Sequence, residues 1–120
     1  MNTVLTLYGI KTCDTVRKAR RWLQARGIEH RFHDFRSDGL PAELLERWVV
    51  QLGWEALLNR ASATYRQLPP KQKENLDQAR ATALMLQHPT LIKRPVAIYG
   101  DEVRTGFREA DWQRWLPTPA

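Results

Sequence analysis

The sequence predicts an α/β domain built on a mixed four-stranded sheet, and three observations carry this prediction. Strand-like segments at residues 3–8 and 30–35 flank an amphipathic helical stretch, a pattern typical of two parallel strands joined by a helix. Residues 95–105 form two short strand-like runs around a Gly-Asp-Glu turn, which is typical of an antiparallel hairpin. The stretch at about 40–90 is mainly helical in pattern and reads as an insert between these two parts.

The first strand and helix are the clearest local signals. Residues 3–8 are β-branched or apolar, and Gly9 ends them, so they predict a buried strand. The helix is expected to begin at Asp14 and to end before Gly27, which suits the position after a helix C-terminus. Its apolar residues recur at helical spacing on one face: Val16, Ala19, Trp22 and Leu23. A short strand is expected next, over residues 30–35.

The helical insert is predicted in three parts. Pro41 suits the first turn of a helix that ends at Gly53. A short helical piece at 54–58 is followed by an irregular segment that runs to Pro69 and Pro70. One longer helix then extends to about Gln87, with an apolar face formed by Leu76, Ala79, Ala83 and Leu84.

The C-terminal part is predicted as strand, turn, strand and helix. Residues 95–99 and 103–105 are the strands, and residues 111–116 form the last helix. A chain of 120 residues fits one domain, so we expect a single domain over 1–117 with a tail at 118–120. We expect a cytoplasmic protein, because the chain has a free thiol, no recognisable signal peptide and no apolar run of about 20 residues. We also expect a monomer.

The cysteine and histidine content excludes several kinds of site. A lone cysteine, Cys13, makes neither an internal disulfide nor a multi-thiolate zinc site. His30, His33 and His88 have no metal-ligand spacing, because the first two are three apart on a strand and lie on opposite faces. We therefore expect no metal and no bound cofactor.

Positive charge is concentrated around this cysteine. The chain carries 19 Lys and Arg against 13 Asp and Glu, a net charge of +6. Residues 11–36 hold eight of these cations and three of the acids, which is +5 of the total. No nucleic-acid-binding motif accompanies them, so nucleic acid is an unlikely partner, and a small anionic thiol such as glutathione fits better.

Cys13 lies where the first strand turns into the first helix. The first N–H groups of a helix lack internal partners and favour an anion, so a sulfur there is stabilised as the reactive thiolate. Lys11, Thr12 and Thr15 shape this turn. The alternative is that Cys13 is an ordinary small buried residue. A Cys-x-x-Cys pair is absent, because its second position is Val16, so a thiol that releases a product from Cys13 has to come from another molecule.

Four ordered segments carry a resemblance to a known family. They are Tyr-Gly-Ile-Lys-Thr-Cys-Asp-Thr at 8–15, Ala-Leu-Leu-Asn-Arg at 56–60, Leu-Met-Leu-Gln-His-Pro at 84–89 and Ile-Lys-Arg-Pro at 92–95. Together they resemble the arsenate reductase-like (ArsC/Spx) family, and most of all its small YffB-type members. The resemblance covers about residues 3–112.

The resemblance implies a thioredoxin-like fold with an inserted helical segment, in which Cys13 is the attacking thiol. It implies that Arg94 and Arg60 bind an anionic substrate near the cysteine, although Asn59 would align in place of Arg60 in the reductase pattern. It also implies a cis peptide bond at Pro95, beside the active cysteine.

One departure bears on the substrate. Where arsenate reductases of this type have a third arginine, this chain has Thr-Gly-Phe at 105–107, flanked by Arg104 and Arg108. The resemblance thus implies a thiol-dependent reductase linked to glutathione, and to glutaredoxin as a further partner. Two alternatives stay open. One is an arsenate reductase coupled to glutathione and glutaredoxin, and the other is an Spx-like transcriptional regulator that binds RNA polymerase.

Overall fold

The computed structural model describes residues 3–117, so the predicted tail at 118–120 lies outside the described residues. The chain divides into two compact units. We call them the sheet unit, residues 3–38 and 94–117, and the helical unit, residues 39–93. The single domain predicted for 1–117 stays a prediction. Within residues 3–117, no helix is both long and apolar enough to cross a membrane.

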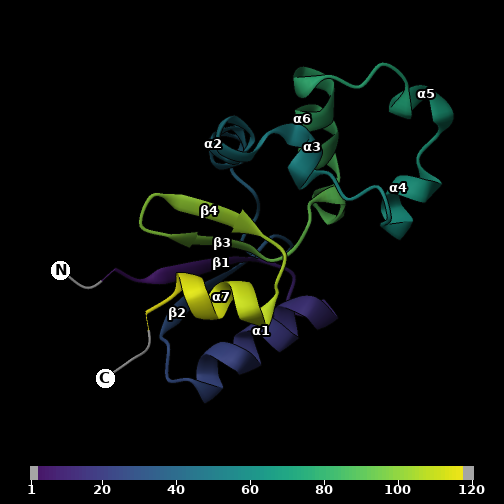
Figure 1. Ribbon diagram of the computed structural model, residues 1–120. Helices are drawn as coiled ribbons and strands as arrows, with labels where there is room; N and C mark the ends of the chain where they lie inside the picture. Colours follow the sequence, from purple (N-terminus) through teal and green to yellow (C-terminus); the bar gives the residue numbers. More distant parts are fainter. Residues whose placement is uncertain (1–2, 118–120) are drawn as a thin grey trace. The chain divides into compact units, whose positions relative to one another are not determined.

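The sheet unit contains the predicted mixed four-stranded sheet, in the order β2-β1-β3-β4 (Figure 1). Strands β1 and β2 are parallel, whereas β3 is antiparallel to both β1 and β4. The α/β class and the mixed sheet are therefore confirmed. The elements of this unit are β1 (Leu5–Gly9), α1 (Asp14–Ala25), β2 (His30–Asp34), β3 (Val96–Tyr99), β4 (Glu102–Thr105) and α7 (Glu109–Trp115).

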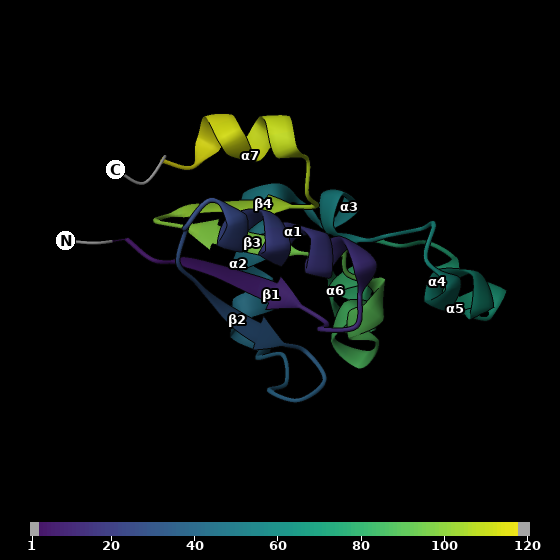
Figure 2. The ribbon, with the colours of Figure 1, turned by 90° about the horizontal axis from the view of Figure 1, so that it is seen from below.

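Helices α1 and α7 cover the same face of this sheet (Figures 1 and 2). Apolar side chains from the strands and both helices form one buried cluster: Leu5, Leu7, Ala19, Leu23, Ala97, Trp112 and Leu116. The predicted inner face of α1 is confirmed for Val16, Ala19 and Leu23, while Trp22 is half-buried at the edge of this cluster. Burial of this face fixes which side of α1 meets solvent.

The helical unit consists of short helices linked by tight turns. They are α2 (Ala42–Leu52), α3 (Trp54–Leu57), α4 (Ala63–Gln67), α5 (Pro70–Lys73), α6 (Gln78–Gln87) and the 3-10 helix η1 (Pro89–Leu91). The predicted end of α2 at Gly53 and the short helix after it are confirmed. The segment expected to be irregular contains α4, whose first turn is capped by Ser62 through a 3.1 Å hydrogen bond from the Tyr65 N–H.

The single helix predicted from Pro70 to Gln87 is wrong. The chain leaves the helical conformation after Lys73, and Asn75 adopts a φ of 52°, a left-handed value that interrupts a helix. Asp77 then caps a new helix by accepting the Arg80 N–H at 2.9 Å. The inner face shifts as a result: Ala79 and Ala83 are exposed, and the buried residues of α6 are Ala81, Leu84 and Met85.

Candidate active site

Cys13 is the N-cap residue of α1, as the sequence predicts. Its backbone is extended, with φ −74° and ψ 127°, and its carbonyl accepts the Arg17 N–H at 2.9 Å to start the helix. Its own N–H donates to the carbonyl of Ile10 at 3.0 Å, which closes the turn from β1. The residue is half-buried, and its side chain makes no capping hydrogen bond. The thiol therefore lies at the positive end of α1, where an anion is stabilised.

Asp34 anchors the turn that carries Cys13, a role that was not predicted from the sequence. The residue ends β2, pairs with Gly9 of β1 and is only 4% exposed. Its carboxylate accepts the N–H of Lys11 at 2.9 Å, together with the N–H groups of Arg36 at 2.7 Å and Ser37 at 3.3 Å. One buried carboxylate thus ties the end of β2 to the loop two residues before Cys13.

The environment of Asp34 favours its ionised form. Burial raises the pKa of this carboxyl, but three backbone N–H donors and the charge of Lys11 outweigh burial and hold the pKa below its usual value. The carboxylate therefore remains an acceptor at neutral pH. The sequence does give a signal for this position, because Asp34 lies next to the end of the strand expected over residues 30–35, parallel to the strand that leads to Cys13.

Strand β1 and helix α1 approach each other closely where Gly9 faces Val16, one on each side of the cysteine turn in the sequence. A Cβ atom on Gly9 would lie 2.7 Å from Cγ2 of Val16, nearer than two carbon atoms can approach without a shift. Val16 is fully buried. The position of a second thiol in a Cys-x-x-Cys pair is thus taken by a packing residue.

Arg94 and Pro95 lie at the same end of the sheet as Cys13. Val96 pairs with Tyr8, so the residues immediately before β3 lie beside the end of β1 that leads into the cysteine turn. The Arg94–Pro95 peptide bond is cis, which confirms the prediction for this bond. The Pro95 carbonyl accepts the Gly106 N–H at 2.9 Å, which joins the end of β4 to this region.

The structure divides the remaining predicted site residues between the two units. Lys11, Thr12 and Thr15 are exposed on the cysteine turn, and the Thr12 carbonyl accepts Nη2 of Arg17 at 2.8 Å. Arg60 belongs to the helical unit, where it is exposed and its guanidinium lies 5.8 Å from the centre of the Trp54 ring. The role of these residues in binding a substrate stays a prediction.

Phe107 belongs to the segment 105–107, where the resemblance implies a third arginine in arsenate reductases, and its surroundings are aromatic. Its ring contacts those of Trp22 and Trp112, with centroid distances of 5.8 and 4.8 Å. Arg104 pairs with Glu102 at 3.2 Å and stacks over Trp115 at 4.5 Å. The position is therefore part of the packing between α1 and α7, while Arg108 is the exposed N-cap residue of α7.

Neither histidine of β2 belongs to a metal cluster. His30 accepts a 3.2 Å hydrogen bond from Nε of Arg20, and the ring of His33 lies 5.0 Å from that of Tyr8. Within the described part of the chain, no group of three or more His, Cys, Asp or Glu residues is arranged to hold a metal ion.

A model of the ArsC family matches residues 8–115. The chain belongs to the ArsC family. The matched segment includes the whole cysteine turn, Asp34 and the cis-proline segment, so the site described above lies inside the family's domain.

Similar proteins agree with this assignment to the ArsC family. The solved structure of a protein named YFFB is 43% identical and superposes with a TM-score of 0.89, over 92% of this chain and 97% of that one. An arsenate reductase (ArsC) related protein from Brucella melitensis is also 43% identical, with a TM-score of 0.79 and 96% of both chains covered. The global transcriptional regulator Spx of Enterococcus faecalis is 30% identical, over 95% of this chain and 87% of its own length. The YffB-type resemblance and the thioredoxin-like fold are thus confirmed.

Proposed function

We propose that this ArsC-family protein is a thiol-dependent reductase in which Cys13 attacks a disulfide or another oxidised substrate. The observation that carries the proposal is the position of Cys13 as N-cap of α1, in a turn held by the buried Asp34. A thiolate is the reactive form of cysteine, and the N-terminus of a helix stabilises it.

The proposed reaction is an exchange of sulfur–sulfur bonds in two steps. The Cys13 thiolate attacks one sulfur of a disulfide, a Cys13 mixed disulfide forms, and the other sulfur leaves as a thiolate. An external thiolate then attacks the mixed disulfide and restores the Cys13 thiolate, with both electrons coming from external thiols. Val16 fills the position of an internal resolving thiol, which favours glutathione as the external reductant.

Cations near the cysteine suit an anionic co-substrate. Arg94 lies at the same end of the sheet as Cys13, and Lys11 is exposed on the cysteine turn. Glutathione carries two carboxylates that pair with such groups, and Arg binds a carboxylate through two parallel hydrogen bonds. We expect Arg94 to bind glutathione or the anionic part of the substrate.

The test is a turnover assay in which glutathione and glutathione reductase couple the reduction of hydroxyethyl disulfide to NADPH consumption. Wild type is expected to raise the rate above the uncatalysed reaction, and Cys13→Ser is expected to lose this gain entirely. Arg94→Ala should raise KM for glutathione, while Arg31→Ala, an exposed cation on β2, should not. Equal rates for wild type and Cys13→Ser would overturn the proposal.

Arsenate reduction is a second candidate, favoured by the similarity to the Brucella melitensis protein described as related to arsenate reductase. Phe107 argues against it, because a tetrahedral oxyanion is bound best by several converging cations. Arsenate-dependent NADPH consumption in a glutathione and glutaredoxin-coupled assay would support this candidate. No consumption at millimolar arsenate would remove it.

Regulation of transcription is a third candidate, favoured by the 30% identity with the Spx regulator of Enterococcus faecalis. The chain lacks a second cysteine at Val16, so a redox switch between two neighbouring thiols is not available. Binding of purified RNA polymerase α subunit by this protein would support the regulator. The absence of such binding, together with turnover, would support the reductase.

A further inference from the structure

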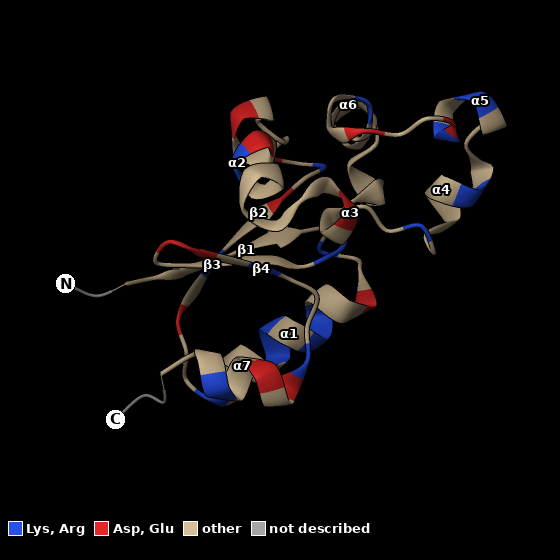
Figure 3. Cartoon of the chain, turned by 45° about the horizontal axis from the view of Figure 1, so that its top comes forward, with Lys and Arg blue, Asp and Glu red and all other residues tan. Residues whose placement is uncertain are grey.

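Arg17 reaches back from α1 to the turn that holds Cys13. Its Nη2 atom donates a 2.8 Å hydrogen bond to the carbonyl of Thr12, the residue before the cysteine. The same atom lies 3.4 Å from Oδ1 of Asp14, the residue after the cysteine. Figure 3 shows an acidic position where α1 begins, followed by basic positions along the helix. The Arg17 side chain therefore contacts both sequence neighbours of the candidate nucleophile.

Two peptide groups of the cysteine turn are joined by one hydrogen bond. The first group contains the Ile10 carbonyl and the Lys11 N–H, and the second contains the Thr12 carbonyl and the Cys13 N–H. The Cys13 N–H donates to the Ile10 carbonyl at 3.0 Å. The carbonyl, the N–H and the following Cα atom of a peptide group lie in one plane. The Cα atom of Cys13 therefore moves with the second group.

A charged side chain binds the outer end of each of these groups. The Asp34 carboxylate accepts the Lys11 N–H of the first group at 2.9 Å. Arg17 donates to the Thr12 carbonyl of the second group at 2.8 Å. Three hydrogen bonds thus form one chain, which we call the turn chain, from the Arg17 guanidinium through both peptide groups to the Asp34 carboxylate. All three run in the same direction, from the cation to the anion, so they polarise and strengthen one another.

The two ends of the turn chain differ in exposure. Asp34 is 4% exposed and binds further backbone N–H groups, whereas the Arg17 side chain is 56% exposed. The ion pair with Asp14 orients the guanidinium, although its 3.4 Å separation is longer than the hydrogen bond to Thr12. Loss of the Arg17 guanidinium therefore opens the chain at its exposed end and leaves no cavity in the core.

We propose that Arg17 is a positioning residue for Cys13, on which it acts by closing the exposed end of the turn chain. This inference rests on the proposed reductase function, in which the sulfur has to stay at the N-terminus of α1 while it attacks and while it leaves. With the Thr12 carbonyl bound, the second peptide group is held at both ends, and the cysteine keeps its orientation. Without Arg17, this carbonyl bonds to water and the turn is held from the Asp34 side alone.

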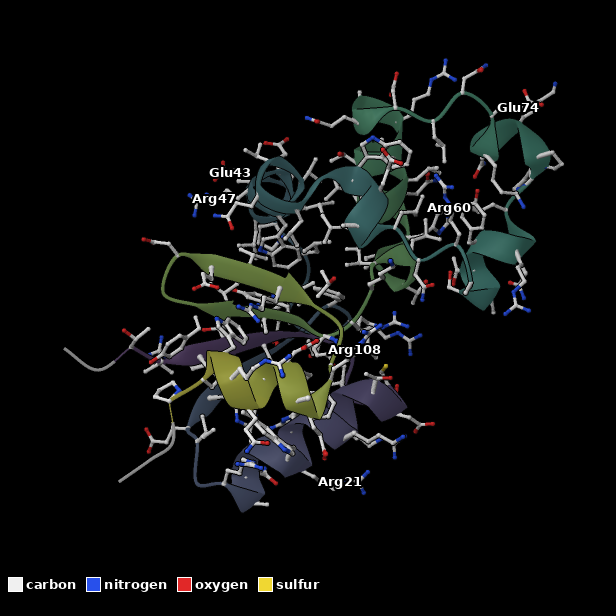
Figure 4. All side chains as sticks on the ribbon, viewed as in Figure 1. Arg21, Glu43, Arg47, Arg60, Glu74 and Arg108 are labelled. Atoms are coloured by element: carbon white, nitrogen blue, oxygen red, sulfur yellow. The ribbon has the colours of Figure 1, made fainter. Side chains whose placement is uncertain are left out.

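The first experiment measures alkylation of Cys13 by iodoacetamide, a reagent that is uncharged and needs neither glutathione nor turnover. Arg17→Met removes the charge and the hydrogen-bond donor, whereas Arg17→Lys keeps a charged donor. Arg21→Met is the matched control, because Arg21 is an exposed arginine one turn further along α1, and Figure 4 shows it directed away from the sheet. Urea unfolding checks that the variants keep the wild-type fold.

Arg17→Met should slow alkylation at pH 7 about three- to fivefold, as the loss of one hydrogen bond would. Arg17→Lys should recover most of this loss, and Arg21→Met should react at the wild-type rate. Iodoacetate, which is charged, should show the same loss for Arg17→Met at high salt, because salt screens the attraction between exposed charges. A wild-type rate for Arg17→Met, an equal loss for Arg21→Met, or a loss confined to iodoacetate at low salt would overturn the proposal.

A double variant with Asp34→Asn tests the turn chain itself. Both ends of the chain hold the same two peptide groups, so the second substitution should slow alkylation much less when the first is already present. Rate losses that multiply in full would give Arg17 and Asp34 independent roles and overturn the turn chain.

The hydroxyethyl disulfide assay separates positioning from binding. Arg17→Met should lower kcat and leave KM for glutathione unchanged, because the residue acts on the sulfur rather than on the co-substrate. A raised KM with an unchanged kcat would make Arg17 a binding residue and overturn the proposal. A wild type without turnover would count against the reductase function instead, while the alkylation rates would still decide the role of Arg17.

Discussion

The interactions that stabilise the sheet unit internally differ in kind from those that stabilise the helical unit internally. In the sheet unit, contacts between residues far apart in sequence dominate, and the Asp34 carboxylate reaches back 23 residues to the N–H of Lys11. In the helical unit, many polar contacts are local: Ser62 caps α4 three residues away, and Asp77 caps α6 in the same manner. Cys13 belongs to the sheet unit, and its turn is held by a long-range hydrogen bond from the Lys11 N–H to Asp34.

The largest loss of stability is expected for a substitution at Asp34 in the sheet unit. Asp34→Ala removes the acceptor of three backbone N–H groups at a buried site and should lower the free energy of unfolding by about 3 kcal/mol. Urea unfolding measures the loss. Alkylation of Cys13 by iodoacetamide at pH 7 should slow at the same time, because the cysteine turn loses its anchor. An unchanged alkylation rate would show that Asp34 stabilises the fold without positioning the thiol.

The second prediction concerns the close approach of β1 and α1. Gly9→Ala places a methyl group 2.7 Å from Val16 and should cost about 2 kcal/mol of stability through overpacking. Gly9→Ala combined with Val16→Ala should recover part of this loss, because it removes the atom in conflict. A failure of the double variant to recover would place the cause elsewhere than at this contact.

In the helical unit, the substitution that corresponds to Asp34→Ala is Asp77→Ala. Asp77→Ala removes one exposed N-cap hydrogen bond and should cost about 1 kcal/mol, a third of the effect at Asp34. Circular dichroism during urea unfolding serves for both variants. If Asp34→Ala and Asp77→Ala lower the free energy of unfolding equally, the proposed contrast between long-range and local anchoring would be wrong.

The smallest expected effect is a pH dependence at the other end of β2. Burial, and then the charge of Arg20, lower the pKa of His30 below its usual value near 6.5. The unfolded chain thus binds the proton first as pH falls, so stability is full above about pH 7 and declines as pH drops through 6.5. His30→Gln should flatten this part of the stability curve. The measurement is thermal unfolding of wild type and His30→Gln between pH 5 and 7.5.

The sequence was sufficient where structure depends on periodic burial. Val16, Ala19 and Leu23 share one helical face, and this spacing predicted both the helix and its buried side. The cysteine turn was also predictable, because Gly9 marks the end of a strand and Asp14 marks the beginning of a helix. The cis bond at Pro95 came from the family resemblance rather than from spacing.

The parts that could not be predicted depend on single residues or on distant partners. The chain leaves the helical conformation after Lys73, and Asn75 adopts a left-handed backbone, although the apolar spacing continues a helical pattern. Ser62 lacks the Glu or Gln three residues later that marks a capping box. The partners of Asp34 and Phe107 could not be predicted, because Lys11, Trp22 and Trp112 are brought to them only by tertiary structure.

The most direct test of the account is the intact mass of the protein after treatment with oxidised glutathione and then with reduced glutathione. We predict that wild type gains one glutathione, that the adduct is lost on addition of reduced glutathione, and that Cys13→Ser gains none. Unfolding the wild type in urea at pH 7 should slow adduct formation, because the sulfur is then no longer placed at the N-terminus of α1. A wild-type protein that forms no adduct, or that reacts no faster folded than unfolded, would contradict the claim that α1 activates Cys13.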